Sequence, residues 1–192
     1  MLESNPVPTF RATLRCRSRT QRGRAESDPG RRIRPIEDPE HLARLVKEAE
    51  VEGPAPLVLV LLLLDAGLRL GEALGLGRGQ VVWGKDEDDR TPALVIDRSR
   101  PRGGEEEHTK RSKARSVGLS RRLRPALADL YHFRRTPEAL VLEGVDPHNF
   151  RHREWRRVLE RAQIGQRAPK DLRDTFASQL LTAGVQLGYV SQ

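Results

Sequence analysis

The feature that most constrains the fold is an unbroken apolar run from Leu57 to Leu64, built only of leucine and valine. The run stops at Asp65 and is less than half of the roughly 20 residues that a bilayer span requires. A segment that is apolar on every side has to be enclosed by other elements, so it predicts a buried helix in a globular domain. We therefore expect no membrane partner.

Length and composition indicate the number of domains and the charge of the expected partner. With 192 residues, 36% hydrophobic and 32% charged, the chain suits one ordinary domain plus a tail. The net charge of +8 favours an anionic partner, above all nucleic acid. The alternative is that genomic base composition alone produced the excess of arginine over lysine. The single Cys16 excludes an internal disulfide and no signal peptide follows Met1, so we expect a reducing, cytoplasmic setting.

The segment of residues 1–34 differs sharply from the rest of the chain. Nine arginines lie between Arg11 and Arg34, with almost no large apolar residues among them. Such a segment buries too little surface to offset the entropy lost on ordering. We expect a basic, disordered arm over residues 1–34 and one domain over residues 35–192. The arm could contact DNA or be a solvated tail.

The pattern after Asp38 predicts mainly helices. Asp38 is a suitable N-cap, Pro39 suits the first helical position, and apolar residues from Leu42 to Ala49 share one face. Further helices are expected through Ala66 and over 69–76, 121–134, 147–163 and 170–183, with strands near 81–83, 93–97 and 115–119. The predicted fold class is α+β: a mainly α-helical domain with a small three-stranded antiparallel sheet.

The first candidate site lies in the sequence Asp-Ala-Gly-Leu-Arg-Leu-Gly-Glu-Ala-Leu-Gly-Leu, residues 65–76. On a helix, Arg69 and Glu72 share one face, so the carboxylate can fix the guanidinium. A fixed guanidinium offers a fork of donors suited to two phosphate oxygens. A purely structural ion pair at the surface is the alternative reading of the same spacing.

Two more basic segments complete the set of candidates. Residues 109–119, Thr-Lys-Arg-Ser-Lys-Ala-Arg-Ser-Val-Gly-Leu, form a basic turn that leads into the last expected strand. Residues 168–178, Ala-Pro-Lys-Asp-Leu-Arg-Asp-Thr-Phe-Ala-Ser, begin a helix that should close at Gly184. Each segment alone is equally compatible with a solvated basic turn or an ordinary helix.

In their order and separations, the three segments resemble the tyrosine recombinase (phage integrase) family over about residues 35–192. The first matches a box of the form Gly-Leu-Arg-x-x-Glu-x-x-x-Leu. The second matches a Thr-Lys turn before a strand that ends near Val-Pro-Leu, with Gly118 in place of the proline. The third matches His-x-Leu-Arg-His-Thr-Phe-Ala, with Lys170 and Asp174 in place of the two histidines.

The resemblance implies specific roles for five residues. Arg69 and Arg173 would hold the scissile phosphate and stabilise the charge of its transition state. Lys110 would protonate the leaving 5′ oxygen, Lys170 would stand at the usual histidine position, and Glu72 would support Arg69.

The resemblance also implies the fold and the reaction. The fold would be the integrase-like fold of DNA breaking-rejoining enzymes. The function would be site-specific DNA recombination and integration, as in mobile genetic elements. A tyrosine attacks the phosphate to form a 3′-phosphotyrosyl link, and the reaction requires no metal and no cofactor. Double-stranded DNA would be the partner, and assembly of a homo-oligomer on the DNA is compatible with the resemblance.

The nucleophile is the part of the family pattern that this sequence does not supply. Tyr131 and Tyr189 do not match its position, and Gln192 is the last residue before the segment that carries it in the family. We therefore expect no strand cleavage by these 192 residues alone. The alternative function is a non-catalytic DNA-binding module or a degenerate mobile-element remnant.

The pair of His148 and His152 is a weaker candidate, for a metal. The two residues are four apart and could share an ion on one helix face, but no neighbouring ligand pattern completes a site. Phe150, Trp155 and Leu159 are expected to be core residues of the same helix.

Overall fold

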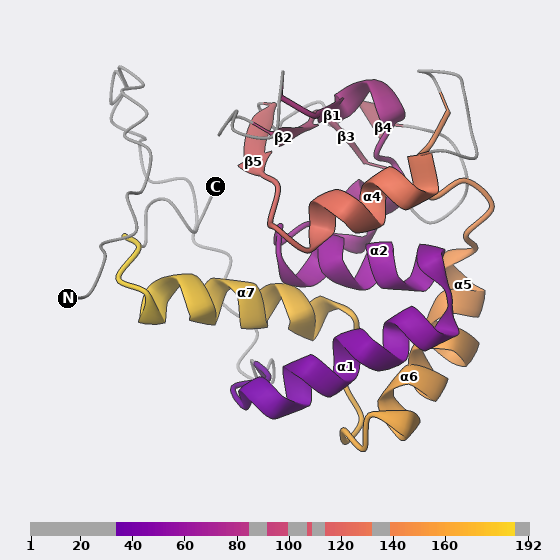
Figure 1. The fold of residues 1–192 in the computed structure, drawn as a ribbon, viewed down its shortest axis with the longest axis vertical. Coiled ribbons are helices and arrows are strands. Elements are labelled where there is room, and N and C mark those ends of the chain that lie inside the picture. Colours follow the sequence, from indigo (N-terminus) through magenta and orange to yellow (C-terminus); the bar gives the residue numbers. More distant parts are fainter. Residues whose placement is uncertain (1–33, 85–91, 100–106, 109–113, 132–138, 187–192) are drawn as a thin grey trace, which may run out of the picture. The chain divides into compact units, whose positions relative to one another are not determined.

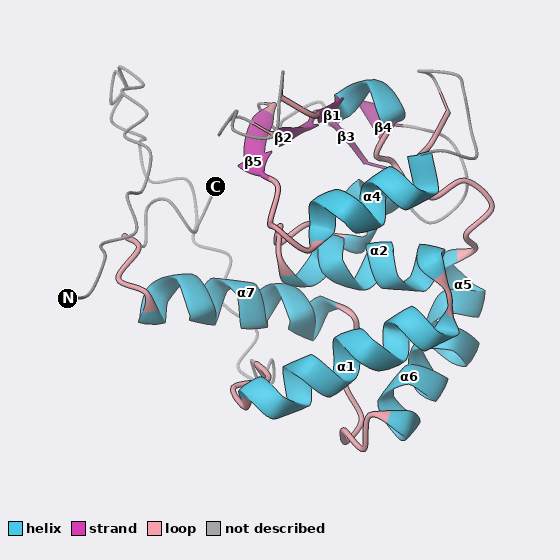
Figure 2. Ribbon diagram, in the orientation of Figure 1, coloured by secondary structure: helices cyan, strands magenta, loops and turns pink. Residues whose placement is uncertain are grey.

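The computed structural model describes residues 34–84, 92–99, 107–108, 114–131 and 139–186 (Figures 1 and 2). All of them belong to the compact unit Ile33–Gln192. The arm expected over residues 1–34 lies outside the described residues apart from Arg34, and Lys110 also lies outside them.

Helix α1, Pro39–Glu52, begins where the sequence predicts. The Oδ1 atom of Asp38 accepts a hydrogen bond from the Glu40 backbone N–H at 2.9 Å, and Pro39 occupies the first helical position. Leu42, Leu45 and Ala49 are buried on one face of the helix. The N-cap and the apolar stripe together fix both the start of α1 and the side that packs inward.

Helix α2, Pro54–Leu64, is the buried centre of the domain. Every residue from Val58 to Leu64 is buried, and the helix contacts α1, α3, α4 and α7. In Figure 1 it runs between α4 and α1. The helix ends at Leu64, two residues earlier than expected, with Asp65 as its C-cap. Within the described part of the chain, no helix is long and apolar enough to cross a membrane.

A three-stranded antiparallel sheet joins β1 (Val81–Val82), β2 (Ala93–Ile96) and β5 (Arg115–Gly118) in the order β1-β2-β5. Leu94 of the central strand is opposite Val81 on one side and Val117 on the other. This confirms the predicted sheet, with each strand one residue shorter than expected. Burial of Leu94 and Ile96 attaches β2 to the core.

A second, two-stranded ladder pairs β3 (Arg98–Ser99) with β4 (Glu107–His108) in antiparallel fashion. The strands expected from the sequence do not include these positions. Both strands consist of polar residues and are joined by backbone hydrogen bonds. They therefore lack the alternation of apolar and polar residues by which a half-buried strand is recognised in a sequence.

One short helix precedes the three-stranded sheet in the sequence and another follows it. Helix α3, Leu70–Leu74, is shorter than the expected 69–76, and it is followed by a 3-10 turn, Arg78–Gln80. Helix α4, Leu123–Tyr131, begins two residues after the expected start at 121. The Oγ atom of Ser120 accepts a hydrogen bond from the Leu123 N–H at 3.1 Å.

The helix expected over residues 147–163 is divided into three parts: α5 (Pro147–Asn149), a π-helical turn (Phe150–Glu154) and α6 (Trp155–Arg161). In the π turn, the N–H of Trp155 donates to the carbonyl of Phe150, five residues earlier. Both rings are buried, with centroids 6.2 Å apart, which confirms them as core residues. The indole Nε1 also donates to the Arg167 carbonyl at 2.7 Å.

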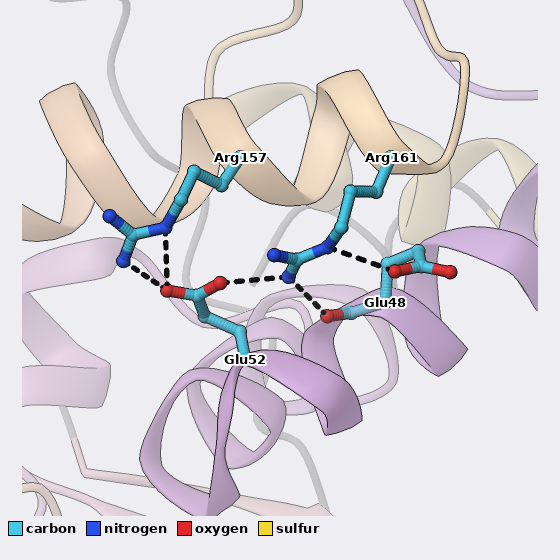
Figure 3. Close-up of polar contacts among 4 residues, drawn as sticks. All are labelled: Glu48, Glu52, Arg157 and Arg161. Atoms are coloured by element: carbon cyan, nitrogen blue, oxygen red, sulfur yellow. Dashed lines mark hydrogen bonds and ion pairs between the residues drawn. The ribbon is translucent and has the colours of Figure 1, made fainter.

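Charged side chains connect α1 to α6, as Figure 3 shows. Arg157 donates from Nε to Oε1 of Glu52 at 2.9 Å and also from Nη2 to the same oxygen. Arg161 donates to Oε2 of Glu52 at 2.7 Å and to Oε2 of Glu48 at 3.0 Å. These contacts form a network of alternating charge across two helices that lie side by side.

Helix α7, Lys170–Thr182, is attached to the core by its first half. Leu172 and Thr175 are fully buried, and the Thr175 hydroxyl accepts a hydrogen bond from the Ile36 N–H at 2.9 Å. The helix ends one residue before the predicted position, and Gly184 follows with a φ of 81°. The segment with Arg173 and Phe176 is therefore held against α2.

Candidate functional site

Arg69 occupies the N-cap of α3, where the backbone is extended with φ −72° and ψ 151°. The expectation that Arg69 lies within the helix was therefore wrong, but the expected pair with Glu72 is present. Glu72 accepts from the Arg69 backbone N–H at 2.8 Å and from its Nη1 atom at 2.8 Å. The short helix thus uses one carboxylate both to cap its first turn and to orient the arginine.

Arg115, at the start of β5, binds the same carboxylate in a fork. Its Nη1 and Nη2 atoms donate to Oε1 and Oε2 of Glu72 at 3.2 and 2.6 Å. The Glu72 side chain is 5% exposed, against 18% for Arg115 and 60% for Arg69. One buried carboxylate therefore ties the α3 segment to the sheet, while the guanidinium of Arg69 remains open to solvent.

Glu72 stays ionised because of these partners. Burial by itself raises the pKa of a carboxyl group. The hydrogen bonds from Arg115 and from the backbone and side chain of Arg69 outweigh burial and hold the pKa of Glu72 below its ordinary value. A single negative charge is thus shared by two arginines.

Arg173 lies on α7 and is half-buried. Burial lowers the pKa of Arg173, and the positive charges of Arg69 and Arg115 lower it further. The negative charges of Glu72 and Asp174 act in the opposite direction. Arg173 makes no hydrogen bond or ion pair with any residue that the structure describes. The fold thus brings arginines from α3, β5 and α7 within electrostatic range of one another.

A cavity of about 280 Å³ opens beside these arginines. Arg115 and Arg173 contribute its positive charge. The other lining residues come from the turn after α2, from β5 and from α7: Asp65, Ala66, Gly67, Ser116, Val117, Gly118, Phe176, Ala177 and Leu180. The cavity therefore combines cationic donors with an apolar wall.

Asp65 secures the other end of β5. It accepts hydrogen bonds from the Ser120 hydroxyl at 2.6 Å and from Nε of Arg122 at 2.7 Å. The pKa of Arg122 is raised, chiefly by this hydrogen bond. Asp65 and Glu72 lie on either side of the turn that carries Arg69, so this turn holds the strand at both ends.

The structure brings together some of the residues that the sequence nominated. Arg69 and Glu72 lie close enough to Arg173 to affect its charge, although neither of them is among the residues that line the cavity. Lys170 is exposed at the first position of α7 and does not line the cavity, and Asp174 is half-buried one residue after Arg173.

Other nominated residues remain outside the site or outside the description. Tyr189 lies outside the described residues, and so does the side chain of Tyr131. The rings of His148 and His152 lie 4.3 Å apart and both residues are exposed. The described residues contain no group of three or more metal-ligating side chains.

Arg115 is the site residue that sequence reasoning missed. It had been placed in a strand but given no partner. The period of two along β5 puts Arg115 on the same side as Val117, the less exposed side of the strand. An arginine on the more buried side of a strand requires a carboxylate, and this requirement is the signal that could have identified it.

Comparison with solved structures identifies the fold. XerA recombinase matches with a TM-score of 0.64 and 18% identity, over 84% of this chain and 56% of that chain. The Tn1549 transposon integrase in complex with transposon right end DNA matches with a TM-score of 0.66 and 16% identity, over 85% and 58%. XerH site-specific recombinase bound to difH substrate matches with a TM-score of 0.63 and 17% identity, over 84% and 47%.

These likenesses confirm the predicted integrase-like fold. The chain spans little more than half of the length of the first of these solved structures. No protein-family model matches the sequence, and no curated protein matches it.

Proposed function

We propose that the chain belongs to the tyrosine recombinase family and that its arginine cluster binds a phosphate of double-stranded DNA. The observation that carries the proposal is that Arg69, at the start of α3, and Arg173, on α7, lie within electrostatic range of each other. The fold supports the same reading, because the similar solved structures include an integrase and a recombinase in complex with DNA.

The charge balance of the site favours an anion. Three guanidiniums are close enough to affect one another, and the buried carboxylate of Glu72 is shared by two of them. Asp65, at the edge of the cavity, is paired with Arg122. A phosphate would accept hydrogen bonds from Arg173 and from the exposed part of Arg69, and it would relieve the repulsion between the two cations.

The same arrangement suits phosphoryl transfer. Donors fixed in place before the reaction stabilise the charge that develops on the phosphate oxygens. We propose Arg69 and Arg173 for this role, Lys110 as the general acid for the leaving oxygen, and Lys170 at the neighbouring histidine position. Neither tyrosine stands at the nucleophile position of the family, so the polypeptide of residues 1–192 is proposed to bind DNA without cutting it.

Salt-dependent binding to a short DNA duplex tests this proposal. Arg69→Ala and Arg173→Ala should each weaken binding and reduce the slope of log K against log salt by about 1, because each removes a phosphate contact. Arg156→Ala is the matched control: Arg156 is an exposed arginine on α6, paired only with Glu160 among the described residues. If the control weakens binding as much as the two site variants, bulk charge rather than the site binds DNA.

Arginine-to-lysine variants separate charge from geometry. Arg69→Lys and Arg173→Lys keep the charge but lose the planar fork, so they should bind more weakly than the wild-type protein. The assay for cleavage is trapping of a covalent adduct on a nicked suicide substrate. An adduct that Tyr131→Phe or Tyr189→Phe abolishes would show that this polypeptide does cut DNA.

A further inference from the structure

Gly67 and Phe176 belong to the two segments that carry Arg69 and Arg173. Gly67 precedes Arg69 by two residues, and Phe176 follows Arg173 by one turn of α7. Both line the cavity beside the arginines. Their contact therefore joins the two segments that the proposed phosphate site requires.

The contact leaves no room for a side chain at residue 67. A methyl group on Gly67 would lie 2.6 Å from Cε1 of Phe176 and still closer to Cδ1, far inside van der Waals contact. The φ of Gly67 is 61°, a backbone conformation that residues with a side chain rarely adopt. The ring of Phe176 is thus seated directly against bare backbone.

The turn on the Gly67 side is fixed in the core. Ala66 and Leu68, on either side of Gly67, are both buried. The backbone N–H of Leu68 donates to the carbonyl of Leu62 at 3.1 Å, which ties the turn to α2. The turn cannot retreat from Phe176 without disrupting these contacts.

The helix on the Phe176 side is fixed as well. Thr175 is fully buried, and its hydroxyl accepts from the Ile36 N–H at 2.9 Å and donates to the Asp171 carbonyl at 2.8 Å. Leu172, one turn earlier, is also fully buried. Both partners of the contact are therefore anchored independently, and the ring fills the space that separates them.

We propose that Phe176, seated on Gly67, sets the separation between Arg69 and Arg173 so that both guanidiniums bind one tetrahedral anion. Phe176 is a positioning residue and does not itself bind the anion. A ring displaced by a larger residue 67 has to push α7 away or turn into the cavity beside Arg173, and either movement disturbs the site. This inference rests on the proposed function.

The test compares two glycine-to-alanine variants of the full chain, with inorganic phosphate as the probe. Gly144 is the matched control, because its φ is 82° but nothing lies within 4 Å of a methyl group placed on it. The measurement is the rise in Tm with phosphate at constant ionic strength. Both variants should lose stability from backbone strain, but Gly67→Ala alone should bind phosphate roughly tenfold more weakly or worse, the equivalent of one charge-assisted hydrogen bond.

A double variant distinguishes positioning from packing. Phe176→Ala in the Gly67→Ala background removes the clash, so the Tm should rise relative to Gly67→Ala. Phosphate affinity should stay low, because the spacer between the arginines is gone. Recovery of affinity together with stability would mean that the contact only packs the fold.

Each remaining outcome decides between the two proposals. If Gly67→Ala binds phosphate as well as Gly144→Ala does, the positioning role is overturned while the phosphate site stands. If phosphate binding by the wild-type chain is insensitive to Arg69→Ala and Arg173→Ala, both proposals fall. Should Gly67→Ala not fold, Phe176→Ala alone decides: weaker phosphate binding in a folded protein supports the positioning role, and unchanged binding refutes it.

Discussion

The carboxylate of Glu72 is held in a fork by Arg115, with its two oxygens 3.2 and 2.6 Å from Nη1 and Nη2. The two residues come from a short helix and from a strand that is distant in sequence. Their pairing fixes the position of the turn that presents Arg69, so the exposed arginine depends on a buried ion pair.

Glu72→Gln should destabilise the domain by about 2 kcal/mol, because it leaves Arg115 partly buried without its charged partner. This expected loss is smaller than for a fully buried ion pair, because Arg69 is largely exposed and its charge is screened by water. Urea unfolding measures the loss. Glu160→Gln, which removes only the exposed pair with Arg156, is the control and should leave stability nearly unchanged. Equal losses in the two variants would contradict the structural role of Glu72.

Asp65→Asn should loosen the junction between β5 and α4, because Asp65 binds both Ser120 and Arg122. We expect a loss of about 1–2 kcal/mol in the free energy of unfolding. A double-mutant cycle with Arg122→Ala should give a coupling energy of about 0.5–1 kcal/mol, since Arg122 is about half exposed. Strict additivity of the two substitutions would show that the contact contributes nothing.

Glu52 should make stability fall at acid pH. The hydrogen bond from Arg157 is the main cause that lowers the pKa of Glu52 in the folded chain, against the opposing effect of burial. As the pH falls, Glu52 in the unfolded chain therefore binds a proton before Glu52 in the folded chain does. The stability that ionised Glu52 contributes is complete above its ordinary pKa of 4.5 and is lost below it. Glu52→Gln should flatten the stability profile between about pH 5 and pH 3. An unchanged profile would contradict the importance of the network in Figure 3.

Glu154 should have the opposite dependence. Burial first, and then the negative charge of Glu52, raise its pKa above 4.5. The folded chain therefore binds this proton more readily than the unfolded chain, and ionised Glu154 opposes folding once the pH exceeds its folded pKa. Glu154→Gln should raise the Tm at neutral pH and have little effect near pH 4. A stabilisation that is the same at both pH values would refute this explanation.

Local chemistry made much of the fold predictable. Asp38 caps the helix that the sequence assigned to it, and the apolar run at 57–64 forms the buried helix. Strand-like residue composition located β2 and β5. In each case the signal lies in a few neighbouring residues.

Features that depend on distant contacts were harder to predict. The role of Arg115 depends on Glu72, more than forty residues away, and spacing along the chain does not reveal that pair. The π turn at 150–154 also gave no signal, because its residues suit an ordinary helix equally well. The nomination of Arg69 and Arg173 came from the resemblance of whole segments, since neither arginine is distinctive alone.

The π turn makes this segment tolerant of a deletion that a regular helix would not tolerate. Phe150 and Trp155 both face inward because the backbone accommodates one residue more than an α-helical turn. Deleting any one residue from 151–154 would leave Phe150 and Trp155 four positions apart, and regular α-helical winding would then keep both rings on one face. A deletion within α6, by contrast, would rotate the residues after it by about 100°. A deletion inside the turn should therefore disturb the contacts of Arg157 and Arg161 with Glu52 less than a deletion within α6 does.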